Sequence, residues 1–181
     1  DEIENGGTAE FILNDVSVLG DSDNQRKTSF VCATDVSWVY TIDKILLENC
    51  FMGIQYGTEL TLTNSTFRNC RYHHMHTDRG VSDYLYVDNC AFYGGTQTNF
   101  ASKNGTILNS LFDGASYCAI YIYGKQCNML IKSTTFVNNK QCGVYSYNSA
   151  NDWRIEVTDC EFYDNSNWIC YMTRTYSSNF V

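Results

Sequence analysis

The three histidines of the chain lie close together, at positions 73, 74 and 76, and Asp78 follows them. If this segment is a strand, His74, His76 and Asp78 share one face, because the side chains of a strand alternate between its two sides. Two imidazoles and a carboxylate can hold a divalent metal ion, and either group can accept a proton in catalysis. A polar surface turn has the same residues by chance, so we expect no metal and no other cofactor.

Tyrosines recur at a long spacing in the second half of the chain. Tyr121, Tyr145 and Tyr171 are 24 and 26 residues apart, and Tyr123 and Tyr147 each follow two residues after one of them. Exposed rings in a row suggest a sugar-binding surface, because a ring contacts the apolar C–H face of a sugar and the phenol adds a hydrogen bond. The alternative is structural, since tyrosine favours strands and stacked rings support one another.

Both interpretations require a fold that brings residues about 25 positions apart into register, and the sequence contains a repeat of that length. Its unit reads apolar, variable, Asn or small polar, small, variable, Phe. The phenylalanines are 25, 20, 24 and 26 residues apart, too long a period for a heptad and too short for the helical solenoids, whose repeats have about 33 residues or more. The copies lie at 62–67, 87–92, 107–112, 131–136 and 157–162, and a shortened copy begins at Leu47.

Each unit contains a bend between two short strands. Asn and Asp tolerate the left-handed backbone region better than other non-glycine residues, which places the bend at the third position. The small residue after the bend points inward, as a reduced thiol where it is Cys50, Cys90 or Cys160. The predicted bend residues, which we expect to form a ladder inside the solenoid, are Asn49, Asn64, Asn89, Asn109 and Asp159.

The core and the outer face follow from aligning the units on phenylalanine. We expect Phe67, Phe92, Phe112 and Phe136 to form one buried stack and Val87, Ile107, Ile131 and Val157 a second. Strand alternation then points position +8 inward and exposes positions +7, +9 and +11. The exposed columns read His76, Ala101, Tyr121, Tyr145, Tyr171 at +9 and Asp78, Lys103, Tyr123, Tyr147, Thr173 at +11.

The segment 50–67, which ends in Leu-Thr-Leu-Thr-Asn-Ser-Thr-Phe, resembles coils of the right-handed parallel β-helices of the pectate-lyase-like superfamily, among them secreted glucanases, lyases and phage tail proteins. The resemblance covers residues 44–172 and implies an all-β fold, a right-handed β-solenoid of about seven coils and roughly 35 Å in length. We expect residues 1–43 to form irregular first coils and residues 173–181 a tail or the start of a further coil. No capping helix is predicted, which indicates a fragment or an uncapped segment.

The same resemblance implies a candidate catalytic set, because lyases and epimerases with this fold use groups on such a face. In that case Asp78 or His76 accepts a proton, Lys103 stabilises charge and Tyr123 donates a proton. The paired carboxylates of glycosidases are not found in the sequence.

Cysteines and sequons suggest modifications typical of an oxidising compartment. The chain has nine cysteines and no Cys-x-x-Cys pair, which argues against a zinc site. Cys118 and Cys142 are the candidate disulfide, because both fall at +6 in consecutive coils, about 4.8 Å apart. Asn64 and Asn104 both begin glycosylation sequons, but we expect Asn64 to be hidden in the inward ladder. Asn104 follows the exposed strand in a turn and is the candidate acceptor.

Charge and composition narrow the partners. The net charge of −8, without a basic cluster, argues against nucleic acid, and no apolar run approaches the ~20 residues that cross a bilayer, so no membrane insertion is expected. We therefore expect an extracellular protein or one on a cell or virion surface. Three functions fit: a carbohydrate-binding or adhesive module that binds a glycan on the tyrosine face, a polysaccharide lyase, epimerase or hydrolase, and a filament segment that stacks end to end with itself. We favour the first.

Overall fold

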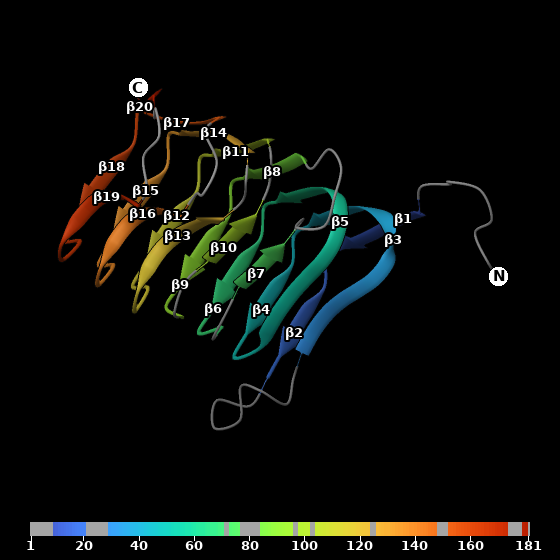
Figure 1. Ribbon diagram of the computed structural model, residues 1–181. Helices are drawn as coiled ribbons and strands as arrows, with labels where there is room; N and C mark the ends of the chain where they lie inside the picture. The colour runs from blue at the N-terminus through green and yellow to red at the C-terminus, as the bar shows by residue number, and fades with distance from the viewer. Residues whose placement is uncertain are drawn as a thin grey trace.

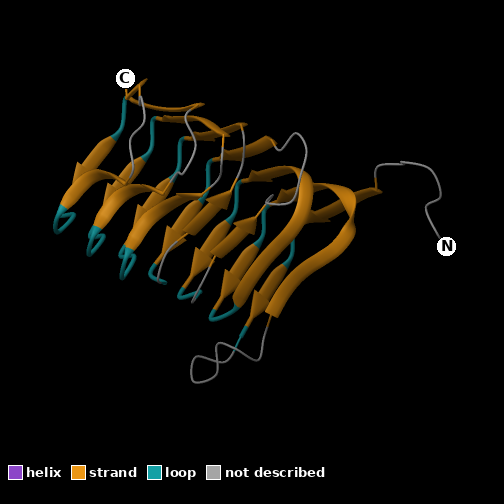
Figure 2. Ribbon diagram, in the orientation of Figure 1, coloured by secondary structure: helices purple, strands orange, loops and turns teal. Residues whose placement is uncertain are grey.

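The computed structural model describes most of the chain as strands and short bends. The described residues are 9–20, 29–70, 73–76, 84–95, 98–101, 104–123, 126–147, 152–173 and 179–180. Within these ranges every regular element is a strand, as Figure 2 shows, and there is no long apolar helix of the kind that crosses a membrane.

The strands form two parallel sheets that wind around a common axis (Figure 1). One is a seven-stranded sheet of short strands, which we call the short-strand sheet. Its members follow one another in chain order, so each strand comes from a successive coil. They are β2 (Ser17–Leu19), β4 (Leu46–Glu48), β6 (Thr66–Arg68), β9 (Ala91–Tyr93), β12 (Leu111–Asp113), β15 (Thr135–Val137) and β18 (Glu161–Tyr163).

The other sheet has 13 strands and supplies two faces of the solenoid. Its two faces meet at β5 (Phe51–Thr63), whose first half pairs with β7 and whose second half pairs with β8. The tyrosine face consists of β7 (His73–His76), β10 (Thr98–Ala101), β13 (Cys118–Tyr123), β16 (Cys142–Tyr147) and β19 (Trp168–Thr173). The second face consists of β8 (Tyr84–Asp88), β11 (Asn104–Leu108), β14 (Gln126–Lys132), β17 (Asp152–Thr158) and β20 (Asn179–Phe180).

The remaining strands begin the solenoid. β1 (Ala9–Asn14) pairs with β3 (Ser29–Asp43) in unbroken register, and β3 pairs with β5 with a register shift near Trp38. The predicted all-β parallel β-solenoid is therefore confirmed. The division at residues 43 and 172 stays a prediction, although β1 and β3 already follow the coil pattern.

The interior consists of columns of like residues, as predicted. Phe67, Phe92, Phe112 and Phe136 are buried, and Phe162 continues their stack at the last coil, where it is partly exposed. Successive ring centroids are 4.7, 4.6, 5.4 and 4.7 Å apart and the rings are nearly parallel. These distances follow the spacing of hydrogen-bonded strands, about 4.8 Å, so the backbone sets the geometry of the stack. The second predicted column, Val87, Ile107, Ile131 and Val157, is also in register.

The bend between the second face and the short-strand sheet has the predicted backbone. Asn64, Asn89, Asn109 and Asp159 have φ between 47° and 53°. Their side chains, however, are exposed, so the predicted inward ladder is wrong in direction. The amides bond along the outside: Asn89 Nδ2 donates to Asn64 Oδ1 at 2.8 Å, and Asn64 Nδ2 donates to Asp43 Oδ1 at 2.7 Å.

The residue after this bend points inward and carries a proton donor. Ser65 Oγ donates to the carbonyl of Thr63 at 2.6 Å and accepts from the backbone N–H of Ile45 in the preceding coil at 3.2 Å. Cys90 lies at the same place, and burial raises the pKa of its thiol to about 12, so it stays protonated and donates to the carbonyl of Leu62. The predicted reduced thiols are present, with Cys50 and Cys90 buried and Cys160 half-buried.

Cys50 and Asn49 belong to the other bend, so their predicted alignment is wrong. Leu47 pairs with Phe67, which places Asn49 beside Asn69 and Cys50 beside Cys70. The short repeat copy misled the alignment, because Leu47 occupies the phenylalanine column rather than the column of Leu62.

This second bend, between the short-strand sheet and the tyrosine face, contains the inward amide ladder that the sequence analysis placed elsewhere. Asn139 is fully buried; its Oδ1 accepts from the N–H of Ala115 at 3.0 Å, and its Nδ2 donates to the carbonyl of Phe112 at 3.2 Å. The same Nδ2 also donates to Asn165 Oδ1 at 2.8 Å. The amide thus links three consecutive coils.

Replacing a stacked ring tests the core. Phe112→Ala should lower the free energy of unfolding by about 3 to 5 kcal/mol, because the rings above and below lose a partner and the columns cannot collapse into the cavity. Leu111→Ala, in the same strand but facing outward, should lose only about 1 kcal/mol. Urea titration followed by circular dichroism measures both, and equal losses would contradict the register.

Replacing the buried amide tests the inward ladder. Asn139→Ala should lower the free energy of unfolding by about 2 to 3 kcal/mol, because the N–H of Ala115 and the carbonyl of Phe112 lose their partner in the interior. Asn138→Gly is the matched control: Asn138 is exposed with φ of 56°, which glycine adopts without strain, so a change below about 1 kcal/mol is expected. A tolerated Asn139→Ala would show that the ladder contributes little.

Candidate functional site

The tyrosine face carries a ladder of aromatic rings across its last coils. Tyr121, Tyr145 and Tyr171 are partners in register, and their ring centroids are 4.9 and 5.3 Å apart. The ladder continues sideways to Tyr117, 6.0 Å from Tyr145, and to Trp168, 4.7 Å from Tyr171. The column predicted from the spacing of these tyrosines is therefore present.

The orientation of the rings differs from the exposed platform that the sequence suggested. Tyr121, Tyr145 and Tyr171 are half-buried, and interplanar angles of 13° and 25° show that the rings cover one another's faces. A stack along the axis leaves ring edges toward solvent, whereas a sugar stacks on a ring face. Trp168, with 45% of its surface exposed, is the aromatic residue of the ladder that offers open surface.

Other residues assigned to this face are placed only in part. Tyr123 and Tyr147 pair in register on β13 and β16, and His76 ends β7, but nothing is described of their side chains. Asp78 and Lys103 lie outside the described residues. The proposed catalytic set of His76, Asp78, Lys103 and Tyr123 is thus not assembled by the described structure and stays a prediction.

The predicted columns were displaced by two residues at two coils, those of His76 and Ala101. Asn99, rather than Ala101, is the partner of Tyr121, and His74 is the partner of Asn99. The connection from Phe92 to Asn99 is two residues shorter than the connection from Phe112 to its register partner Tyr121, so counting from phenylalanine fails there. Position +7 was misassigned at two coils, since Ala119 and Gly143 are buried rather than exposed, whereas Ile169 at +7 of the last coil is exposed as predicted. Gly143 lies against the ring of Phe162.

The tyrosine face has no formal charge along its strands. β7, β10, β13, β16 and β19 contain no Asp, Glu, Lys or Arg, in a chain with 32 charged residues (12 basic and 20 acidic). Burial, reinforced by the neighbouring thiols and phenols, raises the pKa of Tyr117 to about 12, so its hydroxyl remains a proton donor across the physiological range. The face therefore suits a neutral ligand that accepts and donates hydrogen bonds.

Cys118 and Cys142 are partners in register, as predicted, but the structure holds them as free thiols. The predicted disulfide is thus absent, while the adjacency that it requires is present. Both thiols are buried, and the hydrogen bond with Cys142, together with burial, raises the pKa of Cys118.

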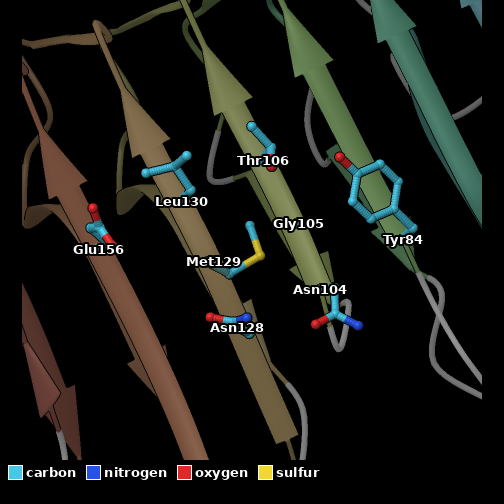
Figure 3. Close-up of a pocket in the computed structure, with 8 residues that line it drawn as sticks. All are labelled: Tyr84, Asn104, Gly105, Thr106, Asn128, Met129, Leu130 and Glu156. Carbon is cyan, nitrogen blue, oxygen red and sulfur yellow. The ribbon is translucent and has the colours of Figure 1, made fainter.

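The second face contains a trough that the sequence analysis did not consider (Figure 3). It is a shallow depression of about 390 Å³, with Tyr84 on β8 at one rim and Glu156 on β17 at the opposite rim. The sequence carries a signal for it in the alternation Tyr84-Leu85-Tyr86, which predicts two outward rings on one strand, although these tyrosines do not share the spacing of Tyr121, Tyr145 and Tyr171. Between the rims lie Asn104, Thr106, Asn128 and Leu130.

Another depression, of about 530 Å³, follows the exposed asparagine bend. Its amides bond to one another and to carboxylates: Asn109 Nδ2 donates to Asp88 Oδ1 at 2.8 Å. These groups hold the coils together, so we regard this depression as structural.

The two sequons differ from expectation. Asn104 is exposed, but it begins β11 rather than lying in a turn, and Asn64 is exposed rather than hidden. Exposure therefore does not distinguish Asn104 from Asn64 as the glycosylation site, and glycosylation of Asn104 stays a prediction. Within the described residues, no three His, Cys, Asp or Glu side chains gather around a metal position.

The parallel coils, the columns of like residues and the asparagine bends with positive φ are the features of a parallel β-helix. The family model described as "Right handed beta helix region" matches residues 31–181. The chain belongs to this family, and the resemblance to the pectate-lyase-like superfamily is consistent with that membership. No curated protein matches the sequence.

Mild oxidation tests the thiol pair. A thiol oxidant such as diamide should join Cys118 to Cys142 in the folded protein, because register partners on adjacent parallel strands lie within the Cα range of a disulfide. Peptide mapping by mass spectrometry without reduction would detect the linked peptides. Cys90 should stay unmodified, since its nearest like positions are serines and its thiol is buried. Failure to cross-link Cys118 and Cys142 while Cys90 reacts would contradict this placement.

Proposed function

We propose that the chain is a carbohydrate-binding module of an extracellular or surface protein, and that it binds a neutral, extended glycan on the tyrosine face. The observation that carries this proposal is the aromatic ladder of Tyr121, Tyr145 and Tyr171 on strands without formal charge. Polyanions should bind poorly, because the whole chain has a net charge of −8.

The geometry favours a binding mode led by hydroxyl groups. Because the ring faces cover one another, a ligand along the axis meets ring edges and a row of phenol oxygens spaced by one strand separation, about 4.8 Å. Hydroxyl groups both donate and accept, so such a row can pair with successive sugar hydroxyls. Trp168, beside Tyr171, adds open aromatic surface at one end of the row.

Each contact is modest in this mode, so affinity depends on several tyrosines together. We expect a dissociation constant in the micromolar range or weaker, about −8 kcal/mol at most. Ligands should be oligosaccharides long enough to contact more than one coil, and monosaccharides should not be retained.

Removing the hydroxyl groups while keeping the rings tests the proposal. The double variant Tyr121→Phe with Tyr145→Phe should weaken glycan binding about tenfold or more, because the stacked rings remain and the phenol hydroxyls are lost. Binding is measured by calorimetry with the neutral oligosaccharides that a glycan array first identifies. Tyr163→Phe is the matched control, since Tyr163 is half exposed on the short-strand sheet and should bind as the wild type does.

Two results would contradict the proposal. One is a wild-type protein that binds no neutral glycan on the array. The other is a double variant that binds as tightly as the wild type, which would reduce the ladder to structural support. Loss of binding in the control variant would instead move the site to the short-strand sheet.

A further inference from the structure

The trough on the second face differs from the tyrosine ladder in its construction. The residues of this face form rows across β8, β11, β14 and β17 because the register is unbroken. One outward row reads Tyr84, Asn104, Asn128, Arg154, and the next reads Tyr86, Thr106, Leu130, Glu156. Large side chains on β8 and β17 flank shorter ones on β11 and β14, which produces the hollow seen in Figure 3. Beyond β8 the rows continue on β5, with Glu59 beside Tyr84 and Thr61 beside Tyr86.

Tyr84 at one rim presents an open ring. It has 42% of its surface exposed, and among the described residues no ring contact covers it. Its neighbour Tyr86 has its phenol engaged, since Tyr86 Oη donates to Asp88 Oδ2 at 3.2 Å. Tyr84 can therefore stack on the C–H face of a sugar, which the covered rings of the ladder cannot do.

The other rim carries a carboxylate that is already neutralised. Arg154 Nη2 donates to Glu156 Oε2 at 2.7 Å, and both residues lie on β17. A carboxylate paired in this way can still accept hydrogen bonds from ligand hydroxyls, because each oxygen has more than one lone pair. Since the pair has no net charge, the rim favours a neutral polar ligand over an anion or a cation.

The floor supplies groups that match sugar hydroxyls. Asn128 is exposed, and its amide has both a donor and an acceptor; Thr106 contributes a hydroxyl beside the apolar side chain of Leu130. Tyr84 and Glu156 are three strand separations apart, about 14 Å. This distance is the length of a short oligosaccharide. An aromatic rim, an amide and hydroxyl floor and a neutralised acid together specify a carbohydrate.

We propose that this trough is a second glycan-binding site, which holds a short neutral oligosaccharide stacked on Tyr84 and hydrogen-bonded to Asn128 and Glu156. This site takes the same class of ligand as the tyrosine ladder but shares no residue with it, so each site can be confirmed or rejected independently of the other. The trough runs along the solenoid axis on a neighbouring face, and one long glycan or two chains can be held by the same module.

The test uses the whole chain, produced in a bacterial host so that Asn104 carries no glycan. Calorimetry with hexasaccharides of β-1,4-glucan, β-1,3-glucan, β-1,4-xylan, β-1,4-mannan and α-1,4-glucan compares the wild type with Tyr84→Ala and Asn128→Ala. Against at least one hexasaccharide we expect Tyr84→Ala to weaken binding about tenfold or more and Asn128→Ala severalfold. Tyr163→Ala is the control for loss of an exposed tyrosine. Circular dichroism confirms that each variant folds, which their exposed positions predict.

The outcomes separate this site from the tyrosine ladder. Binding that is lost in Tyr84→Ala but kept in the Tyr121→Phe, Tyr145→Phe variant supports the trough and contradicts the ladder as the site for that glycan. Binding that is weakened only in the Tyr121→Phe, Tyr145→Phe variant overturns the proposal of a site in the trough. A wild type that binds none of the hexasaccharides also overturns it. Chemical shift changes at the amides of β8, β11, β14 and β17 on addition of the bound hexasaccharide provide a second readout, and their absence would also overturn it.

Discussion

The repeat distance of hydrogen-bonded parallel strands governs this structure. Every coil is held to the next by backbone hydrogen bonds, including in the bends, where the N–H of Asn64 donates to the carbonyl of Asp88 in the next coil at 3.1 Å. The backbone thus places equivalent residues about 4.8 Å apart along the axis. Each side chain meets mainly the side chain at the same position one coil away, and the phenylalanine stack, the amide ladders and the tyrosine ladder all follow from that spacing.

In the interior, this constraint requires every polar group to find its partner along or around the axis. Bend residues supply side-chain donors. The Ser65 hydroxyl donates to the carbonyl of Thr63 in its own coil, and the Cys90 thiol donates to the carbonyl of Leu62 in the preceding coil. Asn139 does the same over a longer reach and connects three coils. Burial keeps the Cys90 thiol protonated and unreactive, so its role is that of a small hydrogen-bonding residue rather than a nucleophile.

On the surface, the same spacing decides which aromatic residues can bind a ligand by stacking. Rings in consecutive coils at one position cover each other, as Tyr121 and Tyr145 do, and expose edges and hydroxyl groups. A ring whose register partners carry no ring, such as Tyr84 between Asn104 and Glu59, keeps its face open. A regular aromatic column is therefore suited to hydrogen bonding, and an isolated ring at the edge of a row of short side chains is suited to stacking.

The sequence by itself determined the architecture, the phenylalanine column, the left-handed bends and the adjacency of Tyr121 with Tyr145 and of Cys118 with Cys142, because each depends on residue type recurring at the period of one coil. It could not determine how many residues a loop takes before the next strand, so His76 and Ala101 were placed two positions away from the column of Tyr121. The shortened copy at Leu47 misplaced Asn49 for another reason, because Leu47 belongs to the phenylalanine column. The direction of the asparagine side chains was also undecided, since a positive φ is compatible with an amide on either side of the wall. Tertiary structure alone decided that the ladder rings cover one another, that Asn139 lies inside, and that short side chains between Tyr84 and Glu156 leave a trough, because these depend on what stands at the same position in the neighbouring coils.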